Sequence, residues 1–249
     1  MVQVILVLSG TSMGNKIAKI LSKEYNVIIS SKTKYGVVEN IKSIYGALNN
    51  RKLENLVKDN NVKIIIDATH DFAQEISKIA INVADALGIK YLRYTEKENI
   101  EKYEKIIYVN SHNEAQKICE KFKRIFFTIG SKNLHIYKEL IKKKIVFVRI
   151  LPILESIEIC EKLNIPPKNI IAMQGPFSKN LNYILFKEKQ VDVVVSKESN
   201  LNEKIKAVKM LNIPIIVIKK PNINYPNTIY SMDKLIQEVE NEIKSSGIR

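Results

Sequence analysis

The chain has 249 residues, of which 40 are Lys or Arg and 26 are Asp or Glu, so its formal net charge is +14. With 45% hydrophobic residues, 8 Gly and 7 Pro, it is neither intrinsically disordered nor collagen-like, and its length suits one large domain or two small ones. No apolar run reaches the roughly 18 residues of a membrane span and the first residues lack a basic leader, so we expect neither membrane insertion nor a signal peptide.

The charge raises the question of a nucleic-acid partner. Only five of the basic residues are arginines, whereas surfaces that read bases or hold phosphates in a bidentate manner favour Arg. Lys, Ile and Asn are abundant together, which indicates a composition bias and not a binding face. We therefore expect no nucleic-acid partner, and an acidic small molecule remains open.

Cysteine and histidine usage argues against metal and disulfide chemistry. Cys119 and Cys160 lie far apart and belong to no CxxC pair, so a reducing cytoplasm is the default location. The three histidines are widely separated and show no ligand spacing with carboxylates. No metal is expected, and we expect His112 and His135 to be surface residues.

Short runs rich in Val and Ile alternate with longer amphipathic segments along the whole chain. The expected strands are Val2–Leu8, Val27–Ser30, Lys63–Asp67, Ile106–Val109, Arg124–Ile129, Ile145–Ile150, Asn169–Ala172, Val191–Val195 and Pro214–Ile218. The expected helices include Met13–Lys23, Phe72–Leu87, Asn113–Lys121, Leu134–Lys143 and Asn202–Leu211. Continuously apolar strands that alternate with helices predict an α/β fold with a doubly wound parallel sheet. A closed eight-stranded barrel is the alternative, because the chain has a typical length for it, but no eight even units emerge.

A polar stretch from Ser111 to Lys123 separates two βα arrays of similar size. We therefore expect two Rossmann-like domains, at residues 1–110 and 111–249. In an open parallel sheet, ligands bind beyond the carboxyl ends of the strands, so the residues that follow each strand are the candidates for function.

The first strand is followed by Ser9-Gly10-Thr11-Ser12-Met13-Gly14 and then by a helix. Such a turn can bring backbone N–H groups and a helix N-terminus to a phosphate, although only two glycines of the full GxGxxG fingerprint are present. An ordinary tight turn is the alternative. The second strand runs into Ser30-Ser31-Lys32-Thr33-Lys34, with no Asp or Glu at its tip. A carboxylate there would favour NAD, so hydroxyls with a cation favour NADPH.

The strand Lys63–Asp67 is followed by Ala68-Thr69-His70-Asp71. An acid, a hydroxyl and an imidazole therefore gather beside the proposed cofactor turn. The alternative is that Asp67 and Thr69 cap the next helix and that His70 is partly exposed.

The strands of the second half end in small, hydroxylated or cationic residues. These ends read Thr128-Ile129-Gly130-Ser131-Lys132, Arg149-Ile150-Leu151-Pro152, Met173-Gln174-Gly175-Pro176-Phe177-Ser178 and Ser196-Lys197-Glu198-Ser199. Arg149 points to bidentate recognition of a carboxylate, with a structural salt bridge as the alternative, and Ser178 is placed to cap a helix. Together they predict a surface suited to anionic groups.

A set of short motifs covers nearly the whole chain in order. They are Gly-Thr-Ser at 10–12, Asp-Ala-Thr-His-x-Phe-Ala at 67–73, Tyr-Leu-Arg at 91–93, Gly-Ser-Lys at 130–132, Arg-x-Leu-Pro at 149–152, Met-Gln-Gly-Pro-Phe-Ser at 173–178 and Lys-Glu-Ser at 197–199. This set resembles the precorrin-6A reductases of cobalamin biosynthesis, including their cobalt-precorrin-6A counterparts. The chain departs from that family at Ser9, where a Gly is usual, at Asp71, where a Pro is usual, and at Asn200, where a Gly-rich turn follows.

The resemblance implies an enzyme that transfers a hydride from NADPH, or alternatively NADH, to a ring double bond of precorrin-6A or cobalt-precorrin-6A. It implies a monomer or weak homodimer, with a nucleotide-binding domain at 1–110, a macrocycle-binding domain at 111–249 and the active site in the cleft between them. Whether the substrate holds cobalt is left open. A non-catalytic, nucleotide-binding regulatory protein is the alternative from a different class.

The resemblance also implies roles for individual residues. Gly10, Thr11 and Ser12 would hold the pyrophosphate, Ser31 and Lys32 would approach the adenosine ribose, and Thr69 would lie near the nicotinamide. His70 would donate a proton with Asp67 in support, or water would supply it. The residues expected to face the carboxylates of the macrocycle are Arg93, Ser131, Lys132, Arg149, Gln174, Gly175, Ser178, Lys197 and Ser199.

Overall fold

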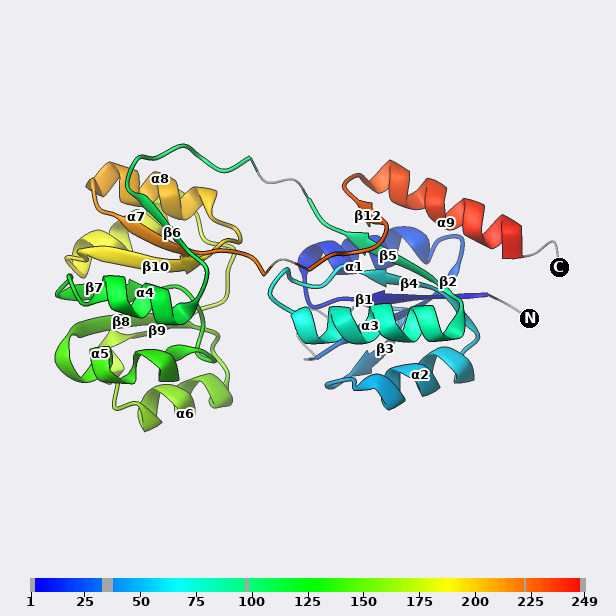
Figure 1. Cartoon of the computed structure of the whole chain (residues 1–249), viewed down its shortest axis with the longest axis horizontal. Helices are drawn as coiled ribbons and strands as arrows, with labels where there is room; N and C mark the ends of the chain where they lie inside the picture. The colour runs from blue at the N-terminus through cyan, green and yellow to red at the C-terminus, as the bar shows by residue number, and fades with distance from the viewer. Residues whose placement is uncertain (1–2, 33–37, 97–98, 222, 247–249) are drawn as a thin grey trace. The chain divides into compact units, whose positions relative to one another are not determined.

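The computed structural model describes residues 3–32, 38–96, 99–221 and 223–246. The chain divides into two compact units, one formed by Met1–Glu98 with Asn222–Arg249 and the other by Asn99–Pro221. Within the described residues, each unit contains a six-stranded sheet in which all neighbouring strands are parallel (Figure 1). The expected doubly wound α/β fold is thus confirmed.

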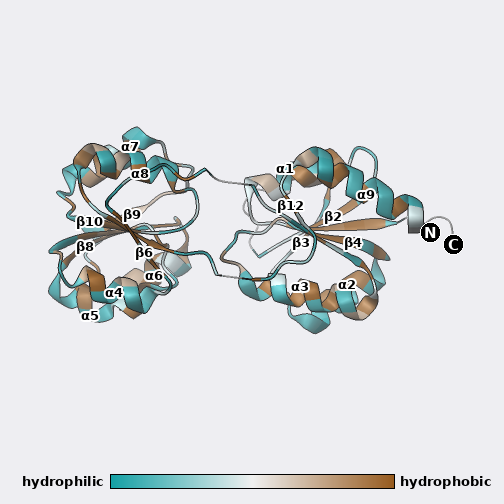
Figure 2. Cartoon of the chain, turned by 45° about the horizontal axis from the view of Figure 1, so that its top comes forward, coloured by the Kyte–Doolittle hydropathy of each residue, from teal (hydrophilic) through white to brown (hydrophobic). Residues whose placement is uncertain are grey.

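The sheet of the first unit has the strand order β12-β5-β4-β1-β2-β3. Its strands are β1 (Val4–Leu8), β2 (Asn26–Ser31), β3 (Lys42–Tyr45), β4 (Val62–Asp67), β5 (Lys90–Tyr94) and β12 (Thr228–Ile229). Its helices are α1 (Ser12–Leu21), α2 (Asn50–Asp59), α3 (Gln74–Leu87) and α9 (Met232–Ser246). Figure 2 shows α1 and α9 on one face of the hydrophobic strands and α2 and α3 on the other. Each face buries its own apolar cluster, because successive side chains of a strand point to opposite faces.

The sheet of the second unit has the order β6-β11-β10-β7-β8-β9. Its strands are β6 (Ile106–Val109), β7 (Arg124–Phe127), β8 (Ile145–Ile150), β9 (Ile170–Ala172), β10 (Val193–Lys197) and β11 (Ile215–Ile218). Its helices are α4 (His112–Cys119), α5 (Lys138–Lys143), α6 (Leu154–Lys162), α7 (Lys179–Glu188) and α8 (Asn202–Leu211), with short 3₁₀ turns at Leu134–Tyr137 and Pro167–Asn169. Helices α7 and α8 cover one face around Phe126 and Phe186, and α4, α5 and α6 cover the other (Figure 2).

The expected boundary between residues 110 and 111 differs from the division in the structure. β6 precedes that boundary but pairs with β11 of the second unit. The C-terminal segment returns to the first unit, where β12 pairs with β5 and α9 buries Leu235 and Val239 in the cluster around β1 and β4. The sequence prediction placed this segment in the second domain because β5 and β12 were not identified as strands.

The strand orders locate one switch point in each sheet. β1 connects to β2 on one side and has β4 on the other, and β7 connects to β8 on one side and has β10 on the other. Doubly wound sheets bind ligands beyond the carboxyl ends of such strand pairs. The segments that follow β1 and β4 and those that follow β7 and β10 are therefore the two places to look for a site.

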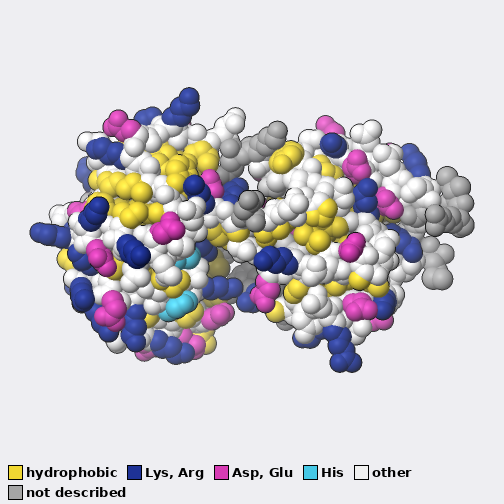
Figure 3. Space-filling model, viewed as in Figure 1, with side chains coloured by type: hydrophobic (Ala, Val, Ile, Leu, Met, Phe, Trp, Pro, Cys, Tyr) yellow, Lys and Arg dark blue, Asp and Glu magenta, His cyan; other side chains and the backbone are white. Residues whose placement is uncertain are grey.

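None of the described helices is long and apolar enough to cross a membrane. Cys119 and Cys160 are both buried free thiols. On the face drawn in Figure 3, Lys and Arg side chains are scattered over both units and interspersed with Asp and Glu.

Candidate functional site

The turn after β1 has the geometry of an anion-binding loop. Gly10 has a φ of +125°, a region that side chains other than Gly rarely adopt. Thr11 caps α1, since its Oγ1 accepts a hydrogen bond from Gly14 N (2.9 Å) and donates one to the carbonyl of Ala68 (2.9 Å). Gly14 N is thus taken by Thr11, whereas the N–H groups of Ser12 and Met13 come before the first intrahelical acceptor and can bind a phosphate. Thr11 therefore orients the turn, and the backbone that begins at Ser12 carries the donors.

Ser9 is accommodated in this turn despite its departure from the family pattern. Its hydroxyl donates to Asn15 Oδ1 (2.8 Å), and it packs against Gly14. A Cβ built on Gly14 would lie 2.5 Å from Ser9 Oγ, so only glycine fits at position 14. Gly14 thus performs the close-packing role of a fingerprint glycine, although it lies four residues after Gly10.

The end of β2 supplies the residues expected near the ribose. Ser30 is buried and accepts a hydrogen bond from Ser9 N through its carbonyl (2.8 Å), which joins the β1 and β2 ends. Ser31 is half-buried, and Lys32 is exposed directly after it. Thr33 and Lys34 lie outside the described residues.

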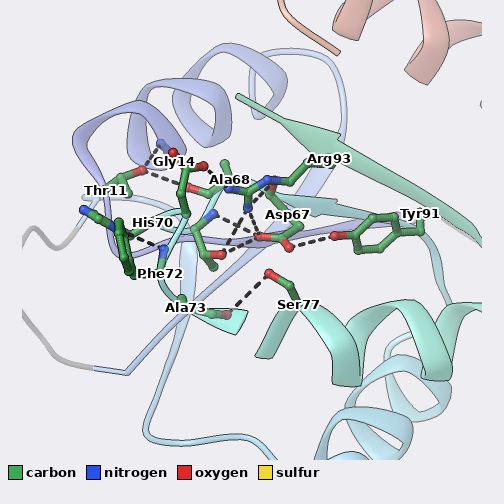
Figure 4. Close-up of polar contacts among 12 residues, drawn as sticks. Thr11, Gly14, Asp67, Ala68, His70, Phe72, Ala73, Ser77, Tyr91 and Arg93 are labelled. Atoms are coloured by element: carbon green, nitrogen blue, oxygen red, sulfur yellow. Dashed lines mark hydrogen bonds and ion pairs between the residues drawn. The ribbon is translucent and has the colours of Figure 1, made fainter. Parts of the chain in front are cut away.

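Asp67 ends β4 and forms a buried network with β5. Its exposed fraction is 0%, and that of Arg93, its register partner in β5, is 1%. Oδ1 accepts hydrogen bonds from Thr69 N (3.0 Å), Thr69 Oγ1 (2.6 Å) and Arg93 Nη1 (2.8 Å), and Oδ2 accepts one from Tyr91 OH (2.7 Å; Figure 4). Burial, followed by the charge of Asp67, raises the pKa of Tyr91, so this phenol stays protonated as a donor. Asp67 and Thr69 thus do not cap the next helix, whose N-cap is Ala73 without a side-chain hydrogen bond.

Arg93 is committed to the carboxylates of its own chain. In addition to Asp67, it donates through Nη2 to Asp71 Oδ1 (2.8 Å), and it lies 4.8 Å from the ring centroid of Tyr225. Its Nε is buried without a hydrogen-bond partner among the described residues. The contact of Arg93 with a substrate carboxylate stays a prediction, and the two ion pairs within its own unit argue against it. Asp71, the second departure from the family pattern, is explained by this ion pair.

His70 is exposed on the turn that this network fixes. Its Nδ1 accepts a hydrogen bond from Phe72 N (3.2 Å), and the two rings are 5.8 Å apart. In Figure 4 the side chains of His70 and Phe72 lie toward Thr11 and away from Tyr91. The structure therefore brings Gly10, Thr11, Thr69 and His70 to one edge of the first sheet.

Arg149 near the end of β8 is the most unusual residue of the second unit. Its exposed fraction is 6%, its Nη1 donates to Asn182 Oδ1 (2.7 Å), and its guanidinium carbon lies 3.8 Å from the ring centroid of Phe177. Phe177 in turn packs on Gly175, where a Cβ would lie 2.9 Å from the ring. Within the described residues no carboxylate pairs with Arg149, and burial lowers its pKa to about 10, which still leaves it charged at neutral pH. The described residues therefore contain no salt bridge of Arg149, the arrangement that was the alternative.

The ends of β7 and β10 bring further cations to the same edge of the second sheet. Lys197 is half-buried, and burial together with the charge of Lys132 lowers its pKa. His112, expected at the surface, is instead half-buried between Tyr137 OH (3.0 Å from Nδ1) and Asn133 Nδ2 (2.9 Å from Nε2). Burial, then Lys197 and His135, lowers the pKa of His112 to about 4. His135 is exposed, as expected. The half-buried position of His112 is not visible in the local sequence, because its partners come from a segment 21–25 residues further along the chain.

The remaining expected residues lie at the same carboxyl edge. Ser131 is buried and shares a hydrogen bond with Ser156 (3.0 Å between the hydroxyl oxygens). Gln174 is exposed, and Ser178 caps α7 by accepting from Leu181 N (3.3 Å). A hollow of about 760 Å³ lies elsewhere, at the amino end of β6 and the carboxyl end of α8, lined by residues such as Tyr103 and Asn212. It lies away from the carboxyl ends of the strands, where doubly wound sheets bind ligands, so it is not a candidate for the site.

Comparison with known proteins gives a consistent result. Residues 4–240 match the family model described as Precorrin-6x reductase CbiJ/CobK. The chain is 34% identical to a cobalt-precorrin-6A reductase of Priestia megaterium over 97% of this chain and 100% of that protein. It is 34% identical to one of Methanocaldococcus jannaschii over 95% and 98%. A solved structure of CobK precorrin-6A reductase superposes with a TM-score of 0.81 at 18% identity, covering 97% of this chain and 98% of that one, which supports the fold.

We expect the substitution Asp67→Asn to lower the free energy of unfolding by about 3–5 kcal/mol, because it leaves the buried Arg93 without its main counter-charge. Asp71→Asn is the matched control, since its side chain is 24% exposed and its pairing with Arg93 is screened by solvent. Urea unfolding measures both. Equal losses in the two variants would contradict the central role of Asp67.

We expect His112 to make stability depend on pH between 6.5 and 4. Its pKa in the folded protein is lowered to about 4, so in this window the unfolded chain binds a proton that the folded chain does not. Acidification should therefore destabilise the wild type relative to His112→Gln, by about 1 kcal/mol after allowance for solvent screening. Unfolding free energies of both proteins at pH 7 and pH 5 measure the difference, and parallel losses would refute it.

Proposed function

Because the chain belongs to the precorrin-6x reductase family, we propose that it reduces a ring double bond of cobalt-precorrin-6A, or of metal-free precorrin-6A, with NADPH. A hydride would pass from the nicotinamide to one carbon of the double bond and a proton would be added to its neighbour, leaving NADP⁺. The cofactor supplies the reactive hydride, and the chain binds and orients both reactants. The cobalt form is our first choice, because the cobalt-named relatives of Priestia and Methanocaldococcus are 34% identical and the precorrin-6A reductase of Sinorhizobium is 25% identical.

The observation that carries this proposal is the uncompensated charge of Arg149. Burying a guanidinium without a carboxylate is unfavourable, so the position favours an anionic ligand. Among the described residues, the hydrogen bond of Arg149 uses only Nη1, which leaves Nε and Nη2 for a ligand. Asn182 and Phe177 hold the guanidinium plane, which suits bidentate binding of a carboxylate. We propose Ser131, Lys132, Gln174, Lys197 and Ser199 as further contacts of the carboxylates of the macrocycle. Gly175 and Ser178 would shape the loop.

We place the cofactor on the first unit. The turn from Gly10 to Ser12 would hold the pyrophosphate at the start of α1, and Ser31 and Lys32 would approach the ribose. The absence of a carboxylate at the described end of β2 favours NADPH over NADH. Thr69 and His70 would lie near the nicotinamide, where His70 is our candidate for the proton donor. Protonation of its Nδ1 requires the hydrogen bond from Phe72 N to open.

The test of this function is oxidation of NADPH by the purified protein with cobalt-precorrin-6A and with precorrin-6A in separate reactions. We expect oxidation that depends on the macrocycle. Folded protein that oxidises NADPH with neither substrate would refute the proposal. Nucleotide binding without any corrinoid binding would instead support a regulatory protein.

We expect Arg149→Ala to raise the KM for the macrocycle by tenfold or more, because a hydrogen bond to a charged group contributes about 1.5–3 kcal/mol. The affinity for NADPH should stay unchanged. Lys143→Ala, which removes an exposed cation of α5, is the control and should leave both constants unchanged. Steady-state kinetics and calorimetry with NADPH measure the effects. Loss of NADPH binding in Arg149→Ala would show that the cofactor is placed on the wrong unit.

We expect His70→Asn to lower kcat by about 100-fold if the imidazole delivers the proton, with little change in NADPH affinity. Asn can still accept the hydrogen bond from Phe72 N, so the turn is retained. The variant Lys32→Gln serves as the comparison: Lys32 is exposed at the end of β2, and its loss should affect the affinity for the cofactor and not kcat. A change of kcat below about threefold in His70→Asn would assign proton delivery to water.

A further inference from the structure

Lys204 on α8 is a buried lysine of the second unit. Its exposed fraction is 9%. The ammonium donates to Ser196 Oγ (3.0 Å) and to the carbonyl of Ser199 (3.0 Å). It therefore lies beneath the loop that carries Lys197 and Ser199. Lysine is rarely buried to this extent, and burying an ammonium costs desolvation free energy that its two hydrogen bonds offset.

The hydrogen bonds of Lys204 continue into the loop itself. Ser196 Oγ, which accepts from Lys204, donates to the carbonyl of Lys197 (3.0 Å), and that carbonyl also accepts from Ser199 N (2.8 Å). Glu198 N donates to the carbonyl of Ile218 at the end of β11 (2.9 Å). The backbone of each residue in the loop thus forms a hydrogen bond. The carbonyl of Ser199 is bonded to the Lys204 ammonium directly, and the carbonyl of Lys197 is linked to it through Ser196 Oγ.

The residue after the loop fits the same arrangement. Asn200 has a φ of +47°, in the left-handed region that Gly and Asn adopt most readily. Asn200, the third departure from the family pattern, can therefore adopt the conformation of this turn without being a glycine. Because Asn is more restricted than Gly, it leaves the loop fewer alternative conformations.

From this network we propose that Lys204 is a positioning residue, which fixes the loop Lys197–Ser199 in the conformation that binds a carboxylate of the macrocycle. This inference rests on the proposed function of that loop. A pre-formed loop lowers the entropy lost on binding, so its effect is on substrate affinity. The ammonium also adds positive potential beneath a site for anions, where low dielectric strengthens it.

The test compares Lys204→Met, which keeps the volume and removes the donor, with Lys206→Met, which removes an exposed cation from the same helix. For Lys204→Met we expect the KM for the macrocycle to rise about tenfold, with kcat and NADPH affinity within about twofold of wild type. Hydrogen exchange of residues 197–200 should accelerate in this variant and not in the control. A lower melting temperature with unchanged KM and unchanged exchange in the loop would overturn the proposal, because a purely structural lysine predicts that result.

Two further variants, Ser196→Ala and Lys197→Met, test the network and the loop separately. Ser196→Ala removes the hydroxyl that links Lys204 to Lys197 and should raise the KM in the same direction, non-additively with Lys204→Met. If Lys204→Met does not fold, an unchanged KM in Ser196→Ala overturns the proposal. Lys197→Met separates this inference from the proposed function: if it raises the KM while both network variants leave it unchanged, the loop binds substrate without help from Lys204. An unchanged KM in Lys197→Met would instead refute the assignment of this loop to the substrate.

Discussion

The buried ion pair between Asp67 and Arg93 is the interaction on which the first unit depends. It joins the carboxyl ends of β4 and β5, and the same carboxylate holds Thr69 N and Thr69 Oγ1. The carbonyl of Ala68, one residue on, accepts the Thr11 hydroxyl that caps α1. One saturated carboxylate therefore determines where both the His70 turn and the start of α1 lie. Both oxygens of Asp67 are engaged by donors of its own unit, so its support for the site is to fix the positions of these groups.

The two buried arginines illustrate how environment decides role. Arg93 is paired with two carboxylates of its own chain, whereas Arg149 has an amide and an aromatic ring and no carboxylate among the described residues. The first arrangement neutralises the charge within the chain, and the second leaves the guanidinium without a counter-charge among the described residues, which is why we propose a ligand there. Arg149 stands in an apolar run and Arg93 does not, but what each guanidinium binds is decided by partners from distant segments. Asp71 and Asn182 lie 22 and 33 residues away from the arginines that they contact.

The sequence was sufficient for the parts of the fold that depend on local pattern. The continuously apolar strands β1, β4 and β8 and the cap at Ser178 follow directly from residue type and spacing. β5 cannot be recognised as a strand from the sequence, because Lys90-Tyr91-Leu92-Arg93-Tyr94 is not an apolar run. Its Arg93 is nevertheless buried, because the guanidinium forms ion pairs. β12 spans only two residues and is defined by its pairing with β5. Both strands and the surroundings of His112 depend on contacts between segments that are far apart in the sequence. The local pattern does not contain these contacts, so the expected domain boundary was also displaced.

The location of the positive charge matters more than its amount. Most Lys residues lie on exposed surfaces, where solvent and salt screen them within about 10 Å. Arg149, Lys197 and Lys204 are different, because they are partly or almost wholly buried near the carboxyl edge of one sheet. A desolvated cation interacts several times more strongly with an anion than an exposed one does. Three such groups therefore favour a small ligand with several carboxylates, which can enter that edge, over an extended polyanion that binds to an exposed surface.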